Sequence, residues 1–228
     1  MINRLRGNPD TLHLGLMLAL TFSTGIVDAV GYLGLDRVFT GNMTGNVVIL
    51  GMALTGADGL PIVGPIIALV LFMAGAAIAG RTLHPVAVGW SDRSTILFAI
   101  VGIVLLLAAI PMFLIHDPAQ PIKYAVTGCL GLAMGMQAGS ARHIGVKDVT
   151  TVVVTSTIVG LAFDSRIGSG NGQPWFRRAG AIALIGTGAG VGALLLRIHI
   201  GAGMAAAAMI TLVVALLGHL GRPGPTSS

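Results

Sequence analysis

The chain has 228 residues, of which 54% are hydrophobic and only 9% are charged, with a mean hydropathy of +0.91. Soluble domains carry about 25% charged residues, so these proportions exclude an ordinary cytosolic enzyme and a disordered tail. The single cysteine, Cys129, excludes a secreted disulfide scaffold. The net charge of +5 does not indicate nucleic-acid binding, because basic residues commonly flank membrane spans. We therefore expect an all-α membrane protein with several spans.

The first predicted element is a retained membrane helix. Arg4 and Arg6 precede the apolar stretch Leu12–Leu35. This stretch is longer than the apolar core of a cleavable signal peptide, which has about 7–15 residues.

Seven further apolar segments follow, and two of them are too short to cross a bilayer. The short ones, Thr40–Leu54 and Val149–Phe163, have 15 residues each and are rich in hydroxyl groups. A helix of that length covers about 22 Å, whereas the hydrocarbon core is about 30 Å thick. The longer predicted segments are Pro61–Gly80, Thr95–Ile115, Ile122–Ala141, Ala179–Leu196 and Gly203–Leu220.

An internal repeat relates the two halves of the chain. Shifting Gly34–Leu50 by 111 positions places it on Gly145–Leu161 and aligns Thr44 with Thr155. In both halves the third segment is rich in Gly and Ala and ends in Arg. The predicted organisation is a first membrane repeat over 1–115, a second over 116–220 and a disordered tail over 221–228.

Basic residues distinguish six membrane crossings from eight. If all eight segments cross, the Lys and Arg residues divide almost evenly between the two sides. If the two short segments enter and return on one side, ten of the 13 basic residues lie on the side of both termini, as cytoplasmic loops require. We therefore predict six transmembrane helices plus two short re-entrant or broken helices. Three crossings per half is an odd number, so the two repeats would be inverted. The alternative is two short, tilted spans in a structural membrane protein.

Asp28 is the strongest candidate for a functional side chain. It lies deep in the first predicted helix, where an acid costs about 2.5–3.5 kcal/mol or more and usually has a function. Proton coupling is one such function. The alternative is a structural hydrogen bond to a neighbouring helix or to the Asn/Thr-rich short segment.

The short segment that starts at Thr40 carries two polar pairs. Thr40 and Thr44 are four residues apart, as are Asn42 and Asn46, so each pair is predicted to share one helical face. Such a face could bind a small polar solute or ion, or it could form hydrogen bonds between helices. The predicted substrate-binding residues are Asp28, Thr40, Asn42, Thr44, Asn46, Gln137, Ser140, Thr151 and Thr155.

Catalysis and metal binding find no support in the motifs. The six His residues are scattered, and the sequence contains no Gly-x-Ser-x-Gly elbow, Walker loop or His-Glu-x-x-His. We therefore expect no enzyme activity, no cofactor and no metal site.

The motifs resemble those of the YoaK family, a bacterial membrane family of unknown function. The resemblance rests on Gly25–Gly34 with its Asp-Ala pair, on Val38–Val47 with Met-Thr-Gly-Asn, and on Met134–Gln137. It implies about six spans and brings no established substrate. The family usually has Asn and Gly where this chain has Ala138 and Ser156, so the polar site is expected to be weighted toward the first half.

These features together predict a transporter or channel for a small solute or ion. It would lie in the bacterial cytoplasmic (inner) membrane with both termini cytoplasmic, a polar site near the midplane and possible proton coupling. The expected partners are the lipid bilayer and a small polar solute or ion, with further copies of the chain as an open alternative, but no nucleic acid. The alternative is a non-transporting membrane assembly or interaction protein that uses its Gly-rich helix faces.

Overall fold

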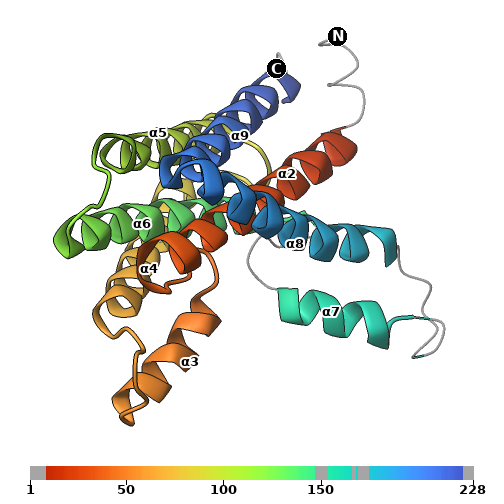
Figure 1. Ribbon diagram of the computed structural model, residues 1–228. Coiled ribbons are helices and arrows are strands. Elements are labelled where there is room, and N and C mark those ends of the chain that lie inside the picture. The colour runs from red at the N-terminus through yellow and green to blue at the C-terminus, as the bar shows by residue number, and fades with distance from the viewer. Residues whose placement is uncertain (1–8, 147–153, 166–167, 169–174, 223–228) are drawn as a thin grey trace.

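The computed structural model describes residues 9–146, 154–165, 168 and 175–222 (Figure 1). Within these ranges every regular element is a helix. The elements are α2 (Pro9–Val30) with its π-helical continuation η1 (Gly31–Asp36), α3 (Met43–Leu54), α4 (Val63–Leu83), α5 (Asp92–Leu114), α6 (Gln120–Ile144), α7 (Val154–Phe163), α8 (Trp175–Ile198) and α9 (Ile200–Gly221).

Five of these helices are long and apolar enough to cross a membrane. They are α2 with η1, then α4, α5, α8 and α9. The sixth long helix, α6, has 25 residues but is less apolar, since it carries Lys123, Gln137 and a series of glycines. The predicted long segments each overlap one of these six helices within a few residues at either end. The all-helical prediction is therefore confirmed, and five of the six predicted spans meet the length and composition of a span.

The two short segments form shorter helices than the hydropathy pattern predicts. The predicted helical segment Thr40–Leu54 becomes helical only at Met43. In the second half, helix α7 starts at Val154, and residues 149–153 of the predicted segment lie outside the described residues. Of the predicted tail, 223–228 also lie outside them. Figure 1 shows α3 beside the start of α4 and α7 beside the start of α8.

Two pairs of helices pack in parallel through glycines. On α6, a Cβ added to Gly135 would lie 2.0 Å from the carbonyl oxygen of Phe72, and one added to Gly75 on α4 would lie 2.1 Å from that of Leu132. Along the crossing, Gly131 faces Ala68, Gly135 faces Phe72 and Gly139 faces Ala76. The contacts advance together along both helices, so α4 and α6 run in the same direction. Backbones that approach this closely leave no space for any side chain larger than hydrogen.

The packing of α2 on α8 repeats this arrangement. A Cβ on Gly25 would lie 2.2 Å from the carbonyl oxygen of Ile185, and one on Gly188 would lie 2.1 Å from that of Phe22. Farther along, Gly192 faces Ile26, so α2 and α8 are also parallel.

The remaining major contacts are antiparallel and fix the direction of every long helix. Asp92 at the start of α5 contacts Arg222 beyond the end of α9. Ser23 on α2 donates a hydrogen bond to the carbonyl of Ala207 on α9 (3.3 Å). Helices α5 and α6 are connected by a short loop and line one hollow side by side. Thus α2, α5 and α8 run one way, and α4, α6 and α9 run the other way.

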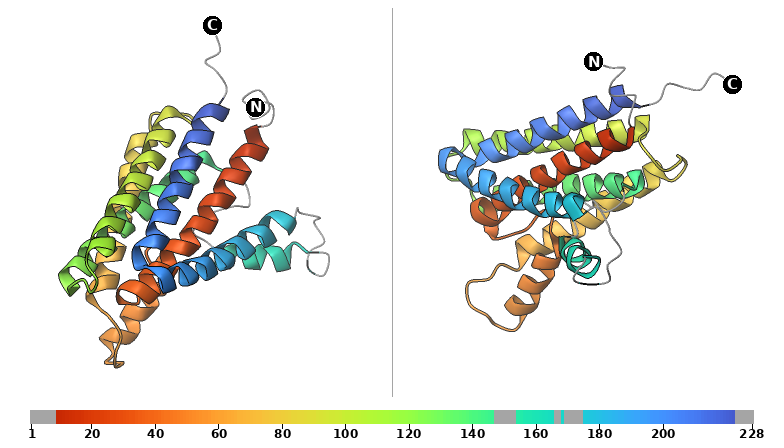
Figure 2. Two further views of the ribbon diagram at one scale, coloured as in Figure 1. Left: turned by 45° about the horizontal axis from the view of Figure 1, so that its top comes forward. Right: turned by 90° about the vertical axis from the view of Figure 1, so that its right-hand side faces the viewer.

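These directions define two ends of the bundle. The near end holds the starts of α2, α5 and α8, and the far end holds the starts of α4, α6 and α9; Figure 2 shows the start of α2 and the end of α9 together at the near end. Because α4 runs opposite to α2, and α8 runs opposite to α6, neither α3 nor α7 adds a net reversal of chain direction. The connection between α2 and α4, which contains α3, therefore begins and ends at the far end, and the connection between α6 and α8, which contains α7, begins and ends at the near end.

Candidate functional site

The segment between η1 and α3 folds back along the helix that precedes it. Arg37 adopts a left-handed conformation (φ 50°), which reverses the chain, and its Nη1 donates to the carbonyl of Gly59 (3.3 Å). The next residue, Val38, donates its backbone N–H to the carbonyl of Gly31 (3.3 Å). Residues 38–42 therefore run from the far end back into the bundle, and we call them the re-entrant segment.

Asp28 anchors the tip of the re-entrant segment. Its Oδ1 accepts hydrogen bonds from the backbone N–H groups of Thr40 (2.9 Å) and Gly41 (2.7 Å), and the N–H of Asn42 also lies toward the carboxyl group. The side chain is 6% exposed, and Oδ2 is buried without a partner. Asp28 lies eight residues before the end of η1, which places the carboxyl group about two helical turns inside the bundle.

Gly41 lies where the re-entrant segment meets α2 and α6. A Cβ at this position would lie 2.8 Å from Cγ2 of Thr24 on α2 and 3.3 Å from Cε of Met134 on α6. It would also lie 3.4 Å from Oδ1 of Asp28. Gly41 therefore lets the backbone enter a gap between the two helices that a side chain would close.

A polar link joins α2 and α6 beside this gap. The hydroxyl of Thr24 donates to the carbonyl of Leu20 (2.9 Å), so its oxygen can only accept from the amide Nε2 of Gln137 (3.1 Å). This fixes the orientation of the amide and leaves its Oε1 buried without a partner. Both side chains are almost completely buried.

Asn46 holds the other flank of the re-entrant segment. Its Oδ1 accepts from the N–H of Phe39 (2.9 Å), and its Nδ2 donates to the carbonyl of Phe39 (2.5 Å). The side chain is completely buried. Its amide is therefore engaged with backbone, in contrast to the free acceptor oxygens of Asp28 and Gln137.

The other predicted site residues divide into buried and exposed groups. Thr40 is buried, and its hydroxyl has no partner, whereas the buried hydroxyl of Ser140 donates to the carbonyl of Met136 (2.8 Å) on its own helix. Asn42 is half-buried just before α3. The side chains of Thr44 and Thr155 are exposed, and Thr151 lies outside the described residues.

The prediction that these Thr and Asn pairs share one helical face is wrong. The helix starts at Met43, so Thr40 and Asn42 belong to the extended segment and only Thr44 and Asn46 are helical. The reason is the long-range bond to Asp28, which takes the N–H groups of Thr40 and Gly41. The same bonds bring Thr40 and Asp28 together, as the site prediction requires.

Thr24 is the buried polar residue of this cluster that the sequence prediction missed. It lies four residues before Asp28 and therefore on the same face of α2. This four-residue spacing could have identified Thr24 from the sequence as a neighbour of Asp28. Its partner Gln137, by contrast, is 113 residues away in the chain and could be predicted only as a separate polar residue.

Two polar hollows lie at opposite ends of the contact between α2 and α6. At the far end, a hollow of about 420 Å³ is lined by η1, by the start of α6 with Lys123, and by Arg197 on α8. At the near end, a hollow of about 360 Å³ is lined by Asp10 and His13 on α2, the end of α6 and Arg177 on α8. The cluster around Asp28 lies between them.

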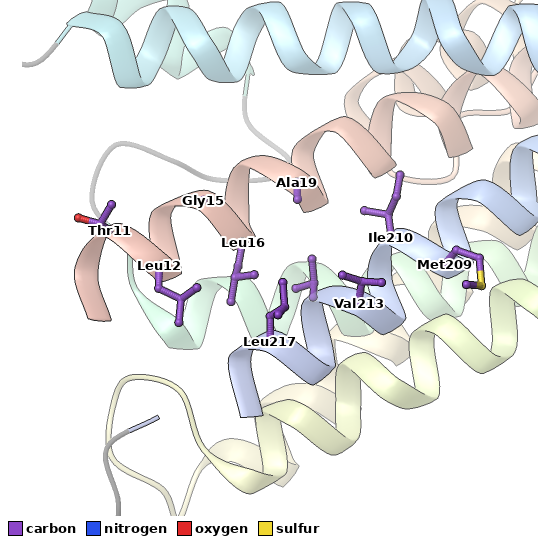
Figure 3. A pocket seen from close by; sticks show the side chains of 10 residues that line it. Thr11, Leu12, Gly15, Leu16, Ala19, Met209, Ile210, Val213 and Leu217 are labelled. Carbon is purple, nitrogen blue, oxygen red and sulfur yellow. The ribbon is translucent and has the colours of Figure 1, made fainter. Parts of the chain in front are cut away.

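A third hollow is of a different kind. It has a volume of about 500 Å³ and opens sideways between α2 and α9 (Figure 3). Apolar side chains line it almost completely, as Leu12, Leu16 and Val213 illustrate. Such a surface suits contact with lipid chains, and Thr11 at its edge is the one polar side chain among the residues that line it. In the described residues, no three His, Cys or Asp side chains gather as metal ligands.

Comparisons with known proteins agree with this membrane architecture. The family model described as "Protein of unknown function (DUF1275)" matches residues 16–217. The chain is similar to the UPF0700 transmembrane protein YoaK of Bacillus subtilis (strain 168), with 30% identity over 153 residues. That match covers 65% of this chain and 65% of the length of the relative. No solved structure matches the chain.

Proposed function

The chain belongs to the DUF1275 family of membrane proteins, and on that premise we propose that it transports a small solute or ion through a site built around Asp28. The observation that carries this proposal is the buried carboxyl group with one oxygen held by the re-entrant segment and the other without a partner. A buried acid with no cationic partner is costly inside a membrane and typically marks an ion or substrate pathway.

The recurrence of the same glycine contacts in the two halves is the first support for transport. Gly25 and Phe22 correspond to Gly135 and Leu132, 110 residues later, and each member of one pair makes the close contact that its counterpart makes. The corresponding helices α2 and α6, α4 and α8, and α5 and α9 run in opposite directions. Two inverted halves with interrupted helices are the common architecture of secondary transporters, whose binding sites lie where the halves meet.

The connections that contain α3 and α7 are the second support. The connection with α3 begins and ends at the far end, and the one with α7 begins and ends at the near end, as two inverted halves would. Non-helical backbone at membrane depth is tolerated only where protein buries it or where it lines a wet cavity. The re-entrant segment meets this condition through Asp28 and Asn46.

The distribution of basic residues supports six crossings with the near end in the cytoplasm. Among the described residues, six Arg lie at the near end and three basic residues lie at the far end. The positive-inside rule then places the near end, and with it the start of α2 and the end of α9, on the cytoplasmic side. The near-end residues are Arg81, Arg93, Arg142, Arg177, Arg178 and Arg222, and those at the far end are Arg37, Lys123 and Arg197.

The two polar hollows and the cluster between them define a route across the bilayer along α2 and α6. A solute would enter one hollow, reach Asp28 and Gln137, and leave by the other. In the described conformation the tightly packed Gly41 closes this route, so passage requires the re-entrant segment to move relative to α2.

Charge movement in proteoliposomes tests the proposal. We expect electrical currents or counterflow for at least one member of a panel of amino acids, organic acids, sugars, nucleobases and alkali cations. The Asp28→Asn and Gln137→Leu variants should reduce that signal at least tenfold, while the exposed control Asp58→Asn retains it. Transport that is unaffected by both site variants, or no transport for the whole panel, would contradict the proposal.

One observation favours an interaction protein as the second candidate. Gly186 and Gly190 lie on the outer face of α8, and a Cβ at either position would meet nothing within 4 Å. Small residues spaced four apart on an exposed helix face suit close association with another helix. A stable stoichiometric partner that is lost in Gly186→Leu, together with an absence of transport, would favour this candidate.

A further inference from the structure

Three oxygen atoms around the tip of the re-entrant segment are buried and have no hydrogen-bond partner. They are Oδ2 of Asp28, Oε1 of Gln137 and Oγ1 of Thr40. The residues are 6%, 0% and 0% exposed. A buried polar atom without a partner costs about 1–3 kcal/mol, so three in one cluster require an explanation.

The contacts of Gly41 and Thr24 bring these residues together. Gly41 and Thr40 donate to the same oxygen of Asp28. A Cβ on Gly41 would touch the methyl group of Thr24, and the hydroxyl of Thr24 accepts from Gln137. Asp28, Thr40 and Gln137 are therefore linked through Gly41 and Thr24 at the place where α2, α6 and the re-entrant segment meet.

The cluster has a surplus of acceptors and a negative charge. The N–H donors of Thr40 and Gly41 are already used by Oδ1 of Asp28. The N–H of Asn42 lies toward the carboxyl group but leaves its Oδ2 without a hydrogen bond. The amide of Gln137 cannot turn its NH₂ group toward the carboxyl group without losing its bond to Thr24. In the described part of the chain, no ion pair involves Asp28. The missing group must therefore be a donor or a cation.

We propose that Asp28, Gln137 and Thr40 bind a small monovalent cation of the Na⁺ type. This proposal rests on the proposed transport function and assigns the ion that the site couples or carries. A carboxylate, an amide oxygen and a hydroxyl are hard oxygen ligands, which exclude the softer transition metals. A single carboxylate provides too little charge for Ca²⁺, which takes six to eight oxygen ligands, commonly several from carboxylates.

The position of the site gives the bound cation a way to act on the route. Two of its ligands lie on the long helices α2 and α6, and the third lies on the re-entrant segment. A cation bound to all three would hold that segment against the helices, and its release would free the segment. Cation binding and closure of the route are thereby linked.

Direct binding of ²²Na⁺ to the purified full-length protein tests this inference. In a scintillation proximity assay with N-methyl-D-glucamine as the replacement cation, we expect saturable ²²Na⁺ binding. Asp28→Asn should abolish it, and Gln137→Leu should weaken it at least tenfold, whereas Asp58→Asn, an exposed loop acid, should bind as the unmodified protein does. Gln137→Leu keeps the anchoring bonds to Asp28, so it tests the ligand role separately from folding.

Two results would overturn the cation site. One is the absence of saturable ²²Na⁺ binding by protein that is monodisperse on size-exclusion chromatography; the other is binding that persists in Asp28→Asn. If either result is obtained while proteoliposomes transport a solute in an Asp28-dependent way, the cation site fails and the transport proposal stands. If no panel member is transported at all, the transport proposal itself fails.

Discussion

Removing the carboxyl group of Asp28 should release the re-entrant segment, whereas replacing it with an amide should not. Asp28→Ala leaves the N–H groups of Thr40 and Gly41 buried without their acceptor. Hydrogen bonds to a charged group contribute about 1.5–3 kcal/mol each, so the loss is about 3–6 kcal/mol before any offset. The substitution also removes the cost of burying an unpaired carboxyl group, which offsets part of this loss. We therefore expect the free energy of unfolding to fall by about 3 kcal/mol in total.

Asp28→Asn keeps a carbonyl oxygen that can accept from both N–H groups. We therefore expect it to cost less than about 1 kcal/mol while it removes the charge that the proposed transport requires. The contrast between Ala and Asn separates the structural role of Asp28 from its chemical role.

Two measurements check this difference. Thermal unfolding can be followed by the fluorescence of Trp90, which is 9% exposed and stacks on His13. A loss of about 3 kcal/mol corresponds to a fall in Tm of about 6–12 °C for a domain of this size. Hydrogen exchange of the amides of Thr40 and Gly41 should accelerate by about 100-fold in Asp28→Ala, since each 1.4 kcal/mol is a factor of ten.

The exposed Asp58 provides the matched control, because Asp58→Ala removes a loop acid without touching the site. The reasoning is refuted if Asp28→Ala and Asp28→Asn lower the Tm equally, or if exchange in the re-entrant segment is unchanged in Asp28→Ala.

Three further predictions follow from the packing and the chain direction. Gly135→Ala should lower stability by about 1–3 kcal/mol, because the added Cβ would overlap the carbonyl of Phe72. The control Gly190→Ala, whose Cβ would meet nothing within 4 Å, should leave the Tm unchanged or slightly higher. Equal effects of the two substitutions would contradict the close crossing of α4 and α6. Asn46→Ala should lower the free energy of unfolding by about 1–3 kcal/mol, because the backbone N–H and carbonyl of Phe39 lose their hydrogen-bond partner. An unchanged Tm would contradict this role of Asn46. In a Cys129→Ser background, Ser91→Cys should react with an impermeant maleimide only after cells are permeabilised, because Ser91 lies at the near end. Labelling of intact cells would show that the near end lies outside the cytoplasm.

Composition and hydropathy were sufficient to predict the long helices, because each must present an apolar surface over the thickness of a bilayer. The six long predicted segments match six helices. Basic residues added the expectation that α3 and α7 return to their own side, which the helix directions support. Helix α6 alone among the six falls short of the hydropathy of a membrane span. Its glycines and Gln137 make contacts with neighbouring helices and lower its apolar content.

The local structure of the site could not be predicted in the same way. The Asn/Thr pairs were read as a helical face because four-residue spacing is a local pattern. The conformation of Thr40 and Gly41 is set instead by Asp28, twelve and thirteen residues earlier. Likewise, the partner of Thr24 comes from the other half of the chain. Neither hydropathy nor local spacing predicts hydrogen bonds between residues that lie so far apart in the sequence.

The packing of α2 has a consequence for biosynthesis. In the described part of the chain, its main helix partners are α8 and α9, with a smaller contact to α6, and all three are made after the first half is complete. Helix α2 is thus made before all three of these partners, and until they follow, Thr24 and Asp28 must remain in lipid or in the insertion machinery. We expect nascent chains that end before α8 to depend on a membrane chaperone and to be degraded quickly without it.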